Sequence, residues 1–98
     1  MTIHQTKNGS ELTVAPEGRL DTATAPELEK TLTPALDGVT SLIFDFEKLA
    51  YISSAGLRVL LSMQKRMNQQ GSMKVLHVSD VIMEIFEVTG FNEILTIE

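Results

Sequence analysis

Two adjacent hydroxyl side chains, Ser53 and Ser54, stand where an apolar segment gives way to one with helical periodicity. The apolar segment is residues 41–46, and the helical segment is residues 55–70. A serine at such a junction can cap the helix, because its oxygen accepts a hydrogen bond from a free N–H group of the first turn. It can also carry a phosphate, which the N-terminus of a helix binds well. The two roles predict different functions.

A second candidate, Asp21, lies in the loop 18–21, before the first predicted helix. In a largely parallel sheet, the loops from strand to helix gather at the carboxyl edge, where ligands and partners usually bind. We therefore expect Asp21 to lie near Ser54, unless the two preceding strands are antiparallel. An aspartate in a loop is also typical of a turn, where it accepts hydrogen bonds from nearby backbone N–H groups.

The sequence contains none of the common arrangements of catalytic residues. There is no Gly-x-x-x-x-Gly-Lys loop, no Gly-x-Gly-x-x-Gly and no Gly-x-Ser-x-Gly. The absence of cysteine excludes disulfides, thiolate catalysis and cysteine-ligated zinc. His4 and His77 lie on separate predicted strands without clustered carboxylates, so we predict no metal site. We predict neither enzymatic activity nor a cofactor.

The composition indicates a small globular protein. The 98 residues allow one core and hence one domain, residues 1–98. The 13 acidic and 8 basic residues give a net charge of -5, which argues against a nucleic-acid partner. No apolar run approaches the ~18 residues of a membrane span, and the N-terminus has no signal-peptide core. We expect a cytoplasmic location and, because the chain starts with Met1, a complete protein.

The N-terminal region predicts a hairpin. Residues 3–7 and 12–16 are predicted to be strands, and Asn8-Gly9 is a strong turn signal because both residues tolerate positive φ. Pro16 cannot donate to a ladder, so the second strand should end there or lie near an edge.

The first helix is predicted to begin at Thr24. Thr24 is placed as N-cap, Pro26 lies in the first turn, and Glu27 completes a capping box. Pro34 should stop or loosen the helix between residues 33 and 37.

The remaining pattern predicts alternating strands and helices. The most apolar strand, residues 42–46, should be central and covered on both faces. The helix 55–70 should expose a set of polar side chains, either for docking or simply as solvated positions: Arg58, Ser62, Lys65, Arg66 and Gln69. A strand over 73–78 follows. Then come a short helix, which Ser79 or Asp80 caps and which ends at residues 89–90, and a short final strand or tail over 92–97. We predict an α/β fold with a mixed, mostly parallel sheet and helices packed on it.

Residues 49–61, Leu-Ala-Tyr-Ile-Ser-Ser-Ala-Gly-Leu-Arg-Val-Leu-Leu, resemble the signature of STAS-domain anti-anti-sigma factors. Residues 18–25 resemble the Gly-x-Leu-Asp turn that precedes the first helix in that family. The resemblance continues through residues 73–78 and 86–91 and covers essentially the whole chain. It implies the small STAS-type fold.

The family signature usually reads Asp-Ser-Ser/Ala-Gly-Leu, and its second residue is the serine that a partner kinase phosphorylates. Here that serine is Ser54, while Ser53 stands where the acidic residue often is. The departure leaves two adjacent hydroxyls, and we favour Ser54 over Ser53 because its spacing to Gly56 and Leu57 matches. Asp21 corresponds to the turn aspartate beside the site.

The resemblance implies partner switching. The unmodified protein would bind an anti-sigma factor that is also a serine kinase, which frees a sigma factor. Phosphorylation of Ser54 would abolish binding, and a serine phosphatase would restore it. The free protein is expected to be a monomer. The expected partner-binding residues are Asp21, Ser53, Ser54, Ala55, Gly56, Arg58 and Ser62.

Two alternatives stay open. STAS-like domains also occur as accessory subunits that regulate membrane transporters, and these need no phosphorylation. The third alternative is an enzyme or nucleotide-binding protein that uses the edge at Asp21 and Ser54, and the absence of a phosphate-binding loop argues against it.

Overall fold

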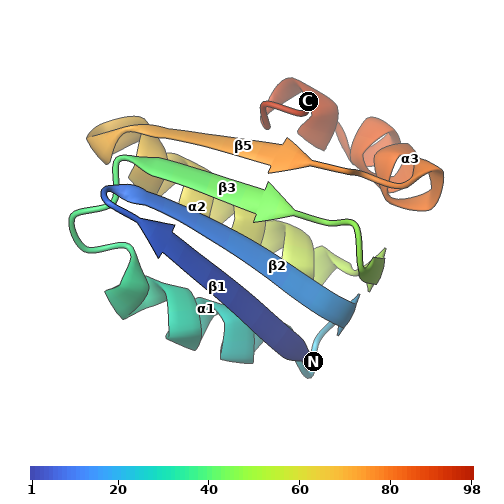
Figure 1. Ribbon diagram of the computed structural model, residues 1–98. Helices are drawn as coiled ribbons and strands as arrows, with labels where there is room; N and C mark the ends of the chain where they lie inside the picture. The colour runs from blue at the N-terminus through green and yellow to red at the C-terminus, as the bar shows by residue number, and fades with distance from the viewer.

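The computed structural model describes residues 1–98 and contains one five-stranded sheet and three α-helices (Figure 1). The strands lie in the order β1-β2-β3-β5, and β4 pairs with β2 off this path. β1 and β2 are antiparallel, and the other pairs are parallel, so the predicted α/β class is confirmed. In chain order the elements are β1 (Thr2–Asn8), β2 (Glu11–Leu20), α1 (Ala25–Ala35), β3 (Ser41–Asp45), β4 (Leu49–Ile52), α2 (Ser54–Gln70), β5 (Ser72–Leu76), α3 (Asp80–Thr89) and a 3-10 helix, η1 (Phe91–Glu93).

β2 differs from the predicted strand, because it neither ends at Pro16 nor lies at an edge. It has β1 on one side and both β3 and β4 on the other. The pairing with β3 reaches only to Val14, and the pairing with β4 starts at Gly18. Backbone N–H groups alternate in direction along a strand. Because the Gly18 N–H donates to the Lys48 carbonyl, the Pro16 nitrogen faces the same side, into the gap between β3 and β4, where no ladder bond is missing.

β4 is an element that the sequence did not predict. Its four residues form a parallel pair with the end of β2. Leu20 is the register partner of Ile52. The loops that follow β2 and β4 therefore leave neighbouring parallel strands at the same edge of the sheet.

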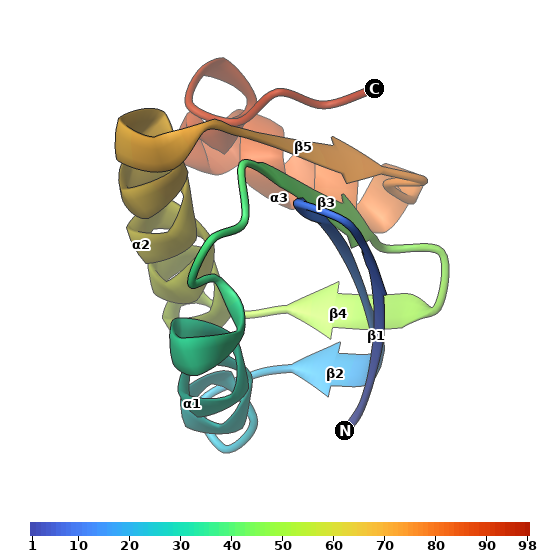
Figure 2. The same cartoon turned by 60° about the vertical axis from the view of Figure 1, so that its left-hand side comes forward.

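The helices are arranged unevenly about the sheet. α1 and α2 lie against one face, α3 lies toward the carboxyl end of β5, and α2 runs between the other two helices (Figures 1 and 2). Twenty-three buried residues form the core between these layers, including Phe44, Met67 and Phe86. None of the helices combines the length and the apolar character that crossing a membrane requires.

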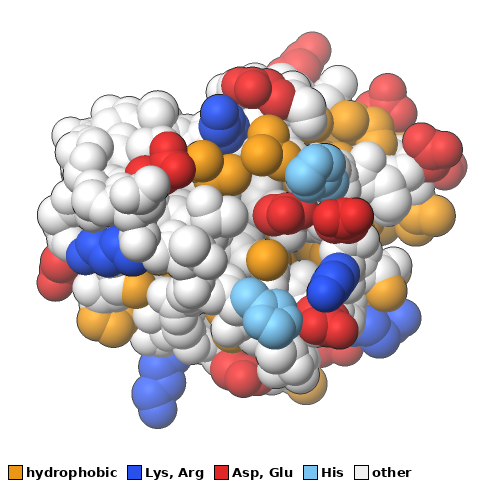
Figure 3. Space-filling view, in the orientation of Figure 1, with side chains coloured by type: hydrophobic (Ala, Val, Ile, Leu, Met, Phe, Trp, Pro, Cys, Tyr) orange, Lys and Arg blue, Asp and Glu red, His pale blue; other side chains and the backbone are white.

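The other face of the sheet carries no helix, so the prediction that both faces of residues 42–46 are covered is wrong. Leu42 and Phe44 point into the core, whereas Ile43 lies outside the core cluster. Ile43 is nevertheless only 8% exposed, because neighbouring side chains on the open face surround it. This face presents histidine, carboxylate and lysine side chains to solvent (Figure 3).

The C-terminal region only partly follows the prediction. α3 begins as expected, with Ser79 as N-cap accepting a hydrogen bond from the Ile82 N–H at 3.3 Å. It ends at Thr89, and its C-cap is Gly90, whose φ of 79° is readily adopted by glycine. Of the two alternatives for residues 92–97, the structure shows the tail, because η1 stands where a strand would begin and only a single bridge joins Val75 to Ile97.

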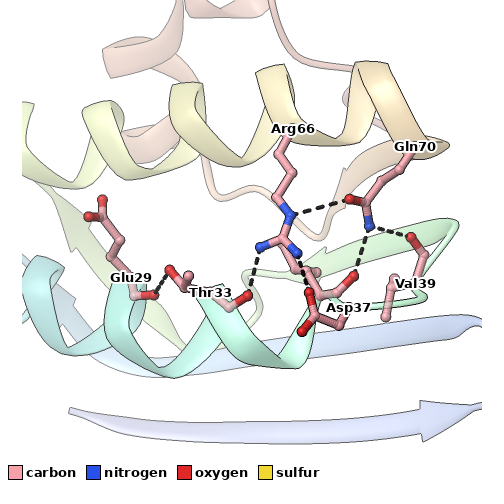
Figure 4. Close-up of polar contacts among 7 residues, drawn as sticks. Glu29, Thr33, Asp37, Val39, Arg66 and Gln70 are labelled. Carbon is pink, nitrogen blue, oxygen red and sulfur yellow. Dashed lines mark hydrogen bonds and ion pairs between the residues drawn. The ribbon is translucent and has the colours of Figure 1, made fainter.

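α1 ends at Ala35, inside the predicted interval, and two side chains of α2 bind its end (Figure 4). The last turn of α1 contains no basic residue to bind its free carbonyls. Arg66, on α2, provides the missing basic side chain and donates to the Thr33 carbonyl at 2.6 Å and to Asp37 Oδ1 at 2.9 Å. Its side chain is 29% exposed, so the prediction that Arg66 is a free surface residue is wrong.

Gln70 completes this junction one turn later. Its Nε2 donates to the carbonyls of Leu36 at 2.8 Å and Val39 at 2.6 Å. Its Oε1 accepts a hydrogen bond from Arg66 Nε at 3.2 Å, so the two side chains hold each other in place (Figure 4). The junction fixes the C-terminal ends of α1 and α2 relative to each other.

We expect Arg66→Ala to lower the free energy of unfolding by about 1 kcal/mol, because the Thr33 carbonyl and the exposed Asp37 carboxylate lose a charged donor. Arg66→Lys should lower the free energy of unfolding by a smaller amount, since an ammonium group cannot make all the hydrogen bonds of the planar guanidinium. Urea titration followed by circular dichroism measures both changes. Lys65→Ala, at an exposed neighbouring position, is the control, and equal losses in Arg66→Ala and Lys65→Ala would contradict the interpretation.

Candidate functional site

The β2–β4 pair positions the two loops singled out from the sequence. The Ser53 N–H donates to the Leu20 carbonyl at 2.9 Å, which extends the pairing by one residue beyond Ile52. Asp21 follows Leu20 directly, and Ser54 begins α2. The structure therefore brings the two loops to one edge of the sheet.

The two serines differ in environment. Ser53 is the N-cap residue by position, with φ -99° and ψ 177°, but its hydroxyl makes no capping hydrogen bond. Ser53 Oγ is buried and has no partner within the protein. Ser54 is exposed to solvent at the first position of the helix. The expected capping bond from Ser53 is therefore absent, and Ser54 carries the accessible hydroxyl.

The start of α2 is suited to an anion. The first backbone bond of the helix is donated by Leu57 to the Ser53 carbonyl, so the N–H groups of Ser54, Ala55 and Gly56 have no acceptor within the helix. The helix dipole places partial positive charge at this end. No acidic residue lies in the first turn, and Arg58 is exposed one turn further on.

Gly56 allows α2 to start close to the sheet. A Cβ atom at this position would lie 2.7 Å from Ile52 Cγ1 and 2.8 Å from Leu20 Cγ, and 3.0 Å from the Leu20 carbonyl oxygen. Gly56 is therefore a close-packing residue. Gly56 is buried, so it positions Ser54 and offers a partner no side chain of its own.

Asp21 organises its own turn, as the alternative explanation of this residue predicts. Its Oδ1 accepts hydrogen bonds from the backbone N–H groups of Ala23 at 3.0 Å and Thr24 at 3.1 Å. The bond from Thr24 is the main reason that the pKa of the Asp21 carboxyl lies below its ordinary value. The carboxylate is thus held ionised beside the site.

The predicted capping box at α1 is wrong. Thr24 has helical angles, φ -98° and ψ -21°, and makes no side-chain cap bond. Its hydroxyl points backward instead, accepting from the Asp21 N–H at 2.9 Å and donating to the Arg19 carbonyl at 2.7 Å. In a capping box the Glu27 side chain would accept from the Thr24 N–H. Asp21 accepts from this N–H instead, so Glu27 has no capping role.

Arg19 and Tyr51 belong to this edge, and the sequence did not reveal them. They are register partners on β2 and β4. The Arg19 guanidinium lies 4.4 Å from the centroid of the Tyr51 ring, a distance typical of a cation–π contact. Its Nε is 3.8 Å from Asp21 Oδ2. Only knowledge of β4 could have placed these side chains together.

A hollow of about 320 Å³ opens between the N-terminal ends of α1 and α2. It adjoins Ser54, because Ala55 and Arg58 line it from the same turn of α2. Its open shape suits an inserted side chain of a partner better than an enclosed small molecule. The lining residues are Thr22, Ala25, Pro26, Glu29, Ala55, Arg58 and Val59.

The open face of the sheet carries a separate group of titratable side chains. His77 Nδ1 lies 2.8 Å from Asp45 Oδ1, and the candidate ligand atoms of His77, Asp45 and Glu47 all lie within 4.8 Å of one another. The statement that the histidines lack clustered carboxylates is therefore wrong, and His4 likewise pairs with Glu17 at 2.9 Å. These pairs lie on the open face of the sheet, and each histidine is hydrogen-bonded to a carboxylate.

The comparisons with known proteins agree with this geometry. Residues 2–98 match the family model described as STAS domain. A protein of Staphylococcus aureus named anti-sigma-B factor antagonist is 38% identical over 80 residues, which are 80% of this chain and 74% of that protein. The solved structure of the anti-sigma factor antagonist SpoIIAA in its unphosphorylated form superposes with a TM-score of 0.85 at 18% identity, over 99% of this chain and 88% of that one. The solved structure of SpoIIAA of Bacillus in its phosphorylated form superposes with a TM-score of 0.77 at 18% identity, over 99% of this chain and 91% of that one. At these identities the structural likeness establishes the fold.

We expect Gly56→Ala to lower the free energy of unfolding by about 1–3 kcal/mol, because the added methyl group overlaps the β2–β4 pair. Helix propensity alone would predict a gain of about 1 kcal/mol. Chemical denaturation therefore distinguishes the two effects by sign. Ser62→Ala, at an exposed position of the same helix, should change little, and a stabilised Gly56→Ala variant would refute the close packing.

We expect NMR titration to give His77 a pKa above its ordinary 6.5, because its ring is hydrogen-bonded to Asp45. The pair's contribution to stability is then present in full below pH 6.5 and is lost as the pH rises through the raised pKa. Asp45→Asn should return the pKa of His77 toward 6.5 and flatten this dependence. An unchanged titration in Asp45→Asn would contradict the assignment.

Proposed function

The chain belongs to the STAS domain family, as its signature residues predict, and from this we propose that it is an anti-sigma factor antagonist switched by phosphorylation of Ser54. One observation carries the choice of switch residue. Ser54 presents its hydroxyl to solvent at the N-terminus of α2, where the preceding strand pair holds it at the edge of the sheet.

Exposure favours Ser54 over Ser53 as the phosphate acceptor. A kinase must bring the hydroxyl oxygen into line with the γ-phosphate of ATP, which requires free access to that oxygen. Ser54 meets this requirement. Ser53 Oγ is buried, and its backbone N–H is engaged with Leu20, so its phosphorylation would require the start of α2 to open.

The electrostatics of the site suit a switch that acts without refolding. A phosphate adds about -1.5 to -2 charges, and the free N–H groups of the first turn of α2 can take them up in the isolated protein. Docked against a partner, the same group would be desolvated or repelled. A loss of ~3 kcal/mol in binding corresponds to about two decades in affinity.

The partner in this proposal is an anti-sigma factor. We infer that it is also the kinase, that a serine phosphatase reverses the modification, and that the free chain is a monomer. Its docking surface would include Asp21, Ser54, Arg58 and Ser62, with a side chain of the anti-sigma factor in the hollow beside Ala55. We place the protein in the cytoplasm, because sigma factors act on RNA polymerase there.

The decisive experiment incubates the protein with ATP and the purified anti-sigma factor of its own host and records intact masses. We expect one added phosphate in the wild type and in Ser53→Ala, and none in Ser54→Ala. In calorimetric titrations Ser54→Ala should bind the anti-sigma factor as the unmodified protein does. Ser54→Glu should bind about a hundredfold more weakly.

Two results would count against this proposal. A phosphate that persists in Ser54→Ala would place the acceptor elsewhere. No phosphate and no binding, with a kinase shown to be active on a control substrate, would favour a STAS accessory subunit of a membrane transporter.

A further inference from the structure

The net charge of the protein comes entirely from its last quarter. All eight lysine and arginine residues lie within residues 1–74, together with eight of the 13 acidic residues, so that part is formally neutral. The remaining five carboxylates are Asp80, Glu84, Glu87, Glu93 and Glu98. The segment that forms α3 and η1 is therefore strongly acidic.

The same segment holds the exposed large hydrophobic residues. Val81 is 58% exposed, Val88 is 77% exposed and Ile94 is 45% exposed, and no other large hydrophobic residue is exposed. Val81 and Val88 are seven residues apart on α3, so they share one side of the helix. Ile82 and Phe86 fill the core from another side. The outward valines are not needed for the core.

The acidic residues of α3 follow this apolar stripe. At 100° per residue, Asp80, Glu84 and Glu87 all fall on one flank of the line from Val81 to Val88. We call the two valines and these three carboxylates the α3 face. It combines apolar anchors with a one-sided row of negative charge, a pattern that fits a complementary protein surface.

α3 lies beside the strand that leads into Ser54. α3 packs against β4, the strand that leads directly into Ser53 and Ser54. It also begins at the carboxyl edge, after β5, while α1 lies at the opposite end of the molecule (Figures 1 and 2). The packing of α3 on β4 therefore brings α3 near the edge of the sheet that carries Ser54.

The charge of the α3 face decides what can cover it. A second copy of the chain would bring two acidic rows together, which is destabilising. Nucleic acids and anionic lipid surfaces are repelled for the same reason. A protein surface rich in lysine and arginine, with apolar side chains among them, is the chemistry that matches.

We infer that the α3 face is a second contact for the anti-sigma factor, bound by a basic and apolar surface of that protein. This rests on the proposed function. Stable interfaces need apolar anchors that are fully desolvated, and the surface around Ser54 offers polar side chains and no exposed large hydrophobic residue. The α3 face supplies those anchors away from the phosphate.

The test measures the dissociation constant for the purified anti-sigma factor, without nucleotide, at 50, 150 and 300 mM NaCl. Val81→Ser/Val88→Ser should bind about tenfold more weakly at every salt concentration, with unchanged thermal unfolding, because both side chains are exposed in the free protein. Glu84→Lys should weaken binding most at 50 mM, and the difference should shrink with salt.

Glu11→Lys is the matched control, because it makes the same change of charge at an exposed position of β2 and should bind as the wild type does. If the α3 variants bind like the wild type while Ser54→Glu does not bind, the α3 contact is refuted and the proposed function stands. If the wild type itself fails to bind the anti-sigma factor, both are refuted. A dimer in size-exclusion chromatography that the valine substitutions abolish would assign the face to a second copy instead.

Discussion

The parallel pairing of β2 with β4 is the interaction on which the candidate site depends. It places Leu20 opposite Ile52, and the next residues along each strand are the turn aspartate and the two serines. The pairing continues into the loop through the bond from the Ser53 N–H to the Leu20 carbonyl. Because both strands feed helices on the same side of the sheet, the N-terminal ends of α1 and α2 meet at one edge, with the hollow between them (Figure 2).

The two helices are then fixed at both ends by different chemistry. At the N-terminal end, Gly56 lets α2 approach the strand pair, and Asp21 closes the turn before α1. At the C-terminal end, Arg66 and Gln70 bind the free carbonyls of α1 (Figure 4). Packing alone would allow the helices to slide, whereas these directional bonds define their register. A rigid frame of this kind is what a switch based on charge requires, since the partner must detect a new charge rather than a new shape.

The parts of the fold that the sequence predicts are those written in local patterns. The Asn8-Gly9 turn, the end of α1 near Pro34 and the start of α3 at Ser79 all follow from the residues at those positions. The failures arise where a distant partner decides. Pro16 is tolerated in a central strand because two different strands flank it, and β4 is a strand because the end of β2 lies beside it. The Thr24 hydroxyl makes no cap bond because the Asp21 N–H and the Arg19 carbonyl occupy it, and Asp21 accepts the Thr24 N–H in place of Glu27.

Ser53 and Ser54 illustrate the same limit within the site. Two identical side chains in adjacent positions cannot be ranked by type, and only the direction of the backbone separates them. Ser53 has an extended backbone and Ser54 is the first residue of the helix, so their side chains point to different sides. The hydroxyl of Ser53 is buried and that of Ser54 is exposed. Residues 53–56 are all small, and at Gly56 the strand pair leaves no room even for a Cβ atom. Ser54 is the one among them whose side chain lies clear of that constraint, which explains how a bulky, charged group could be added there while the close packing of α2 on β2 and β4 stays intact.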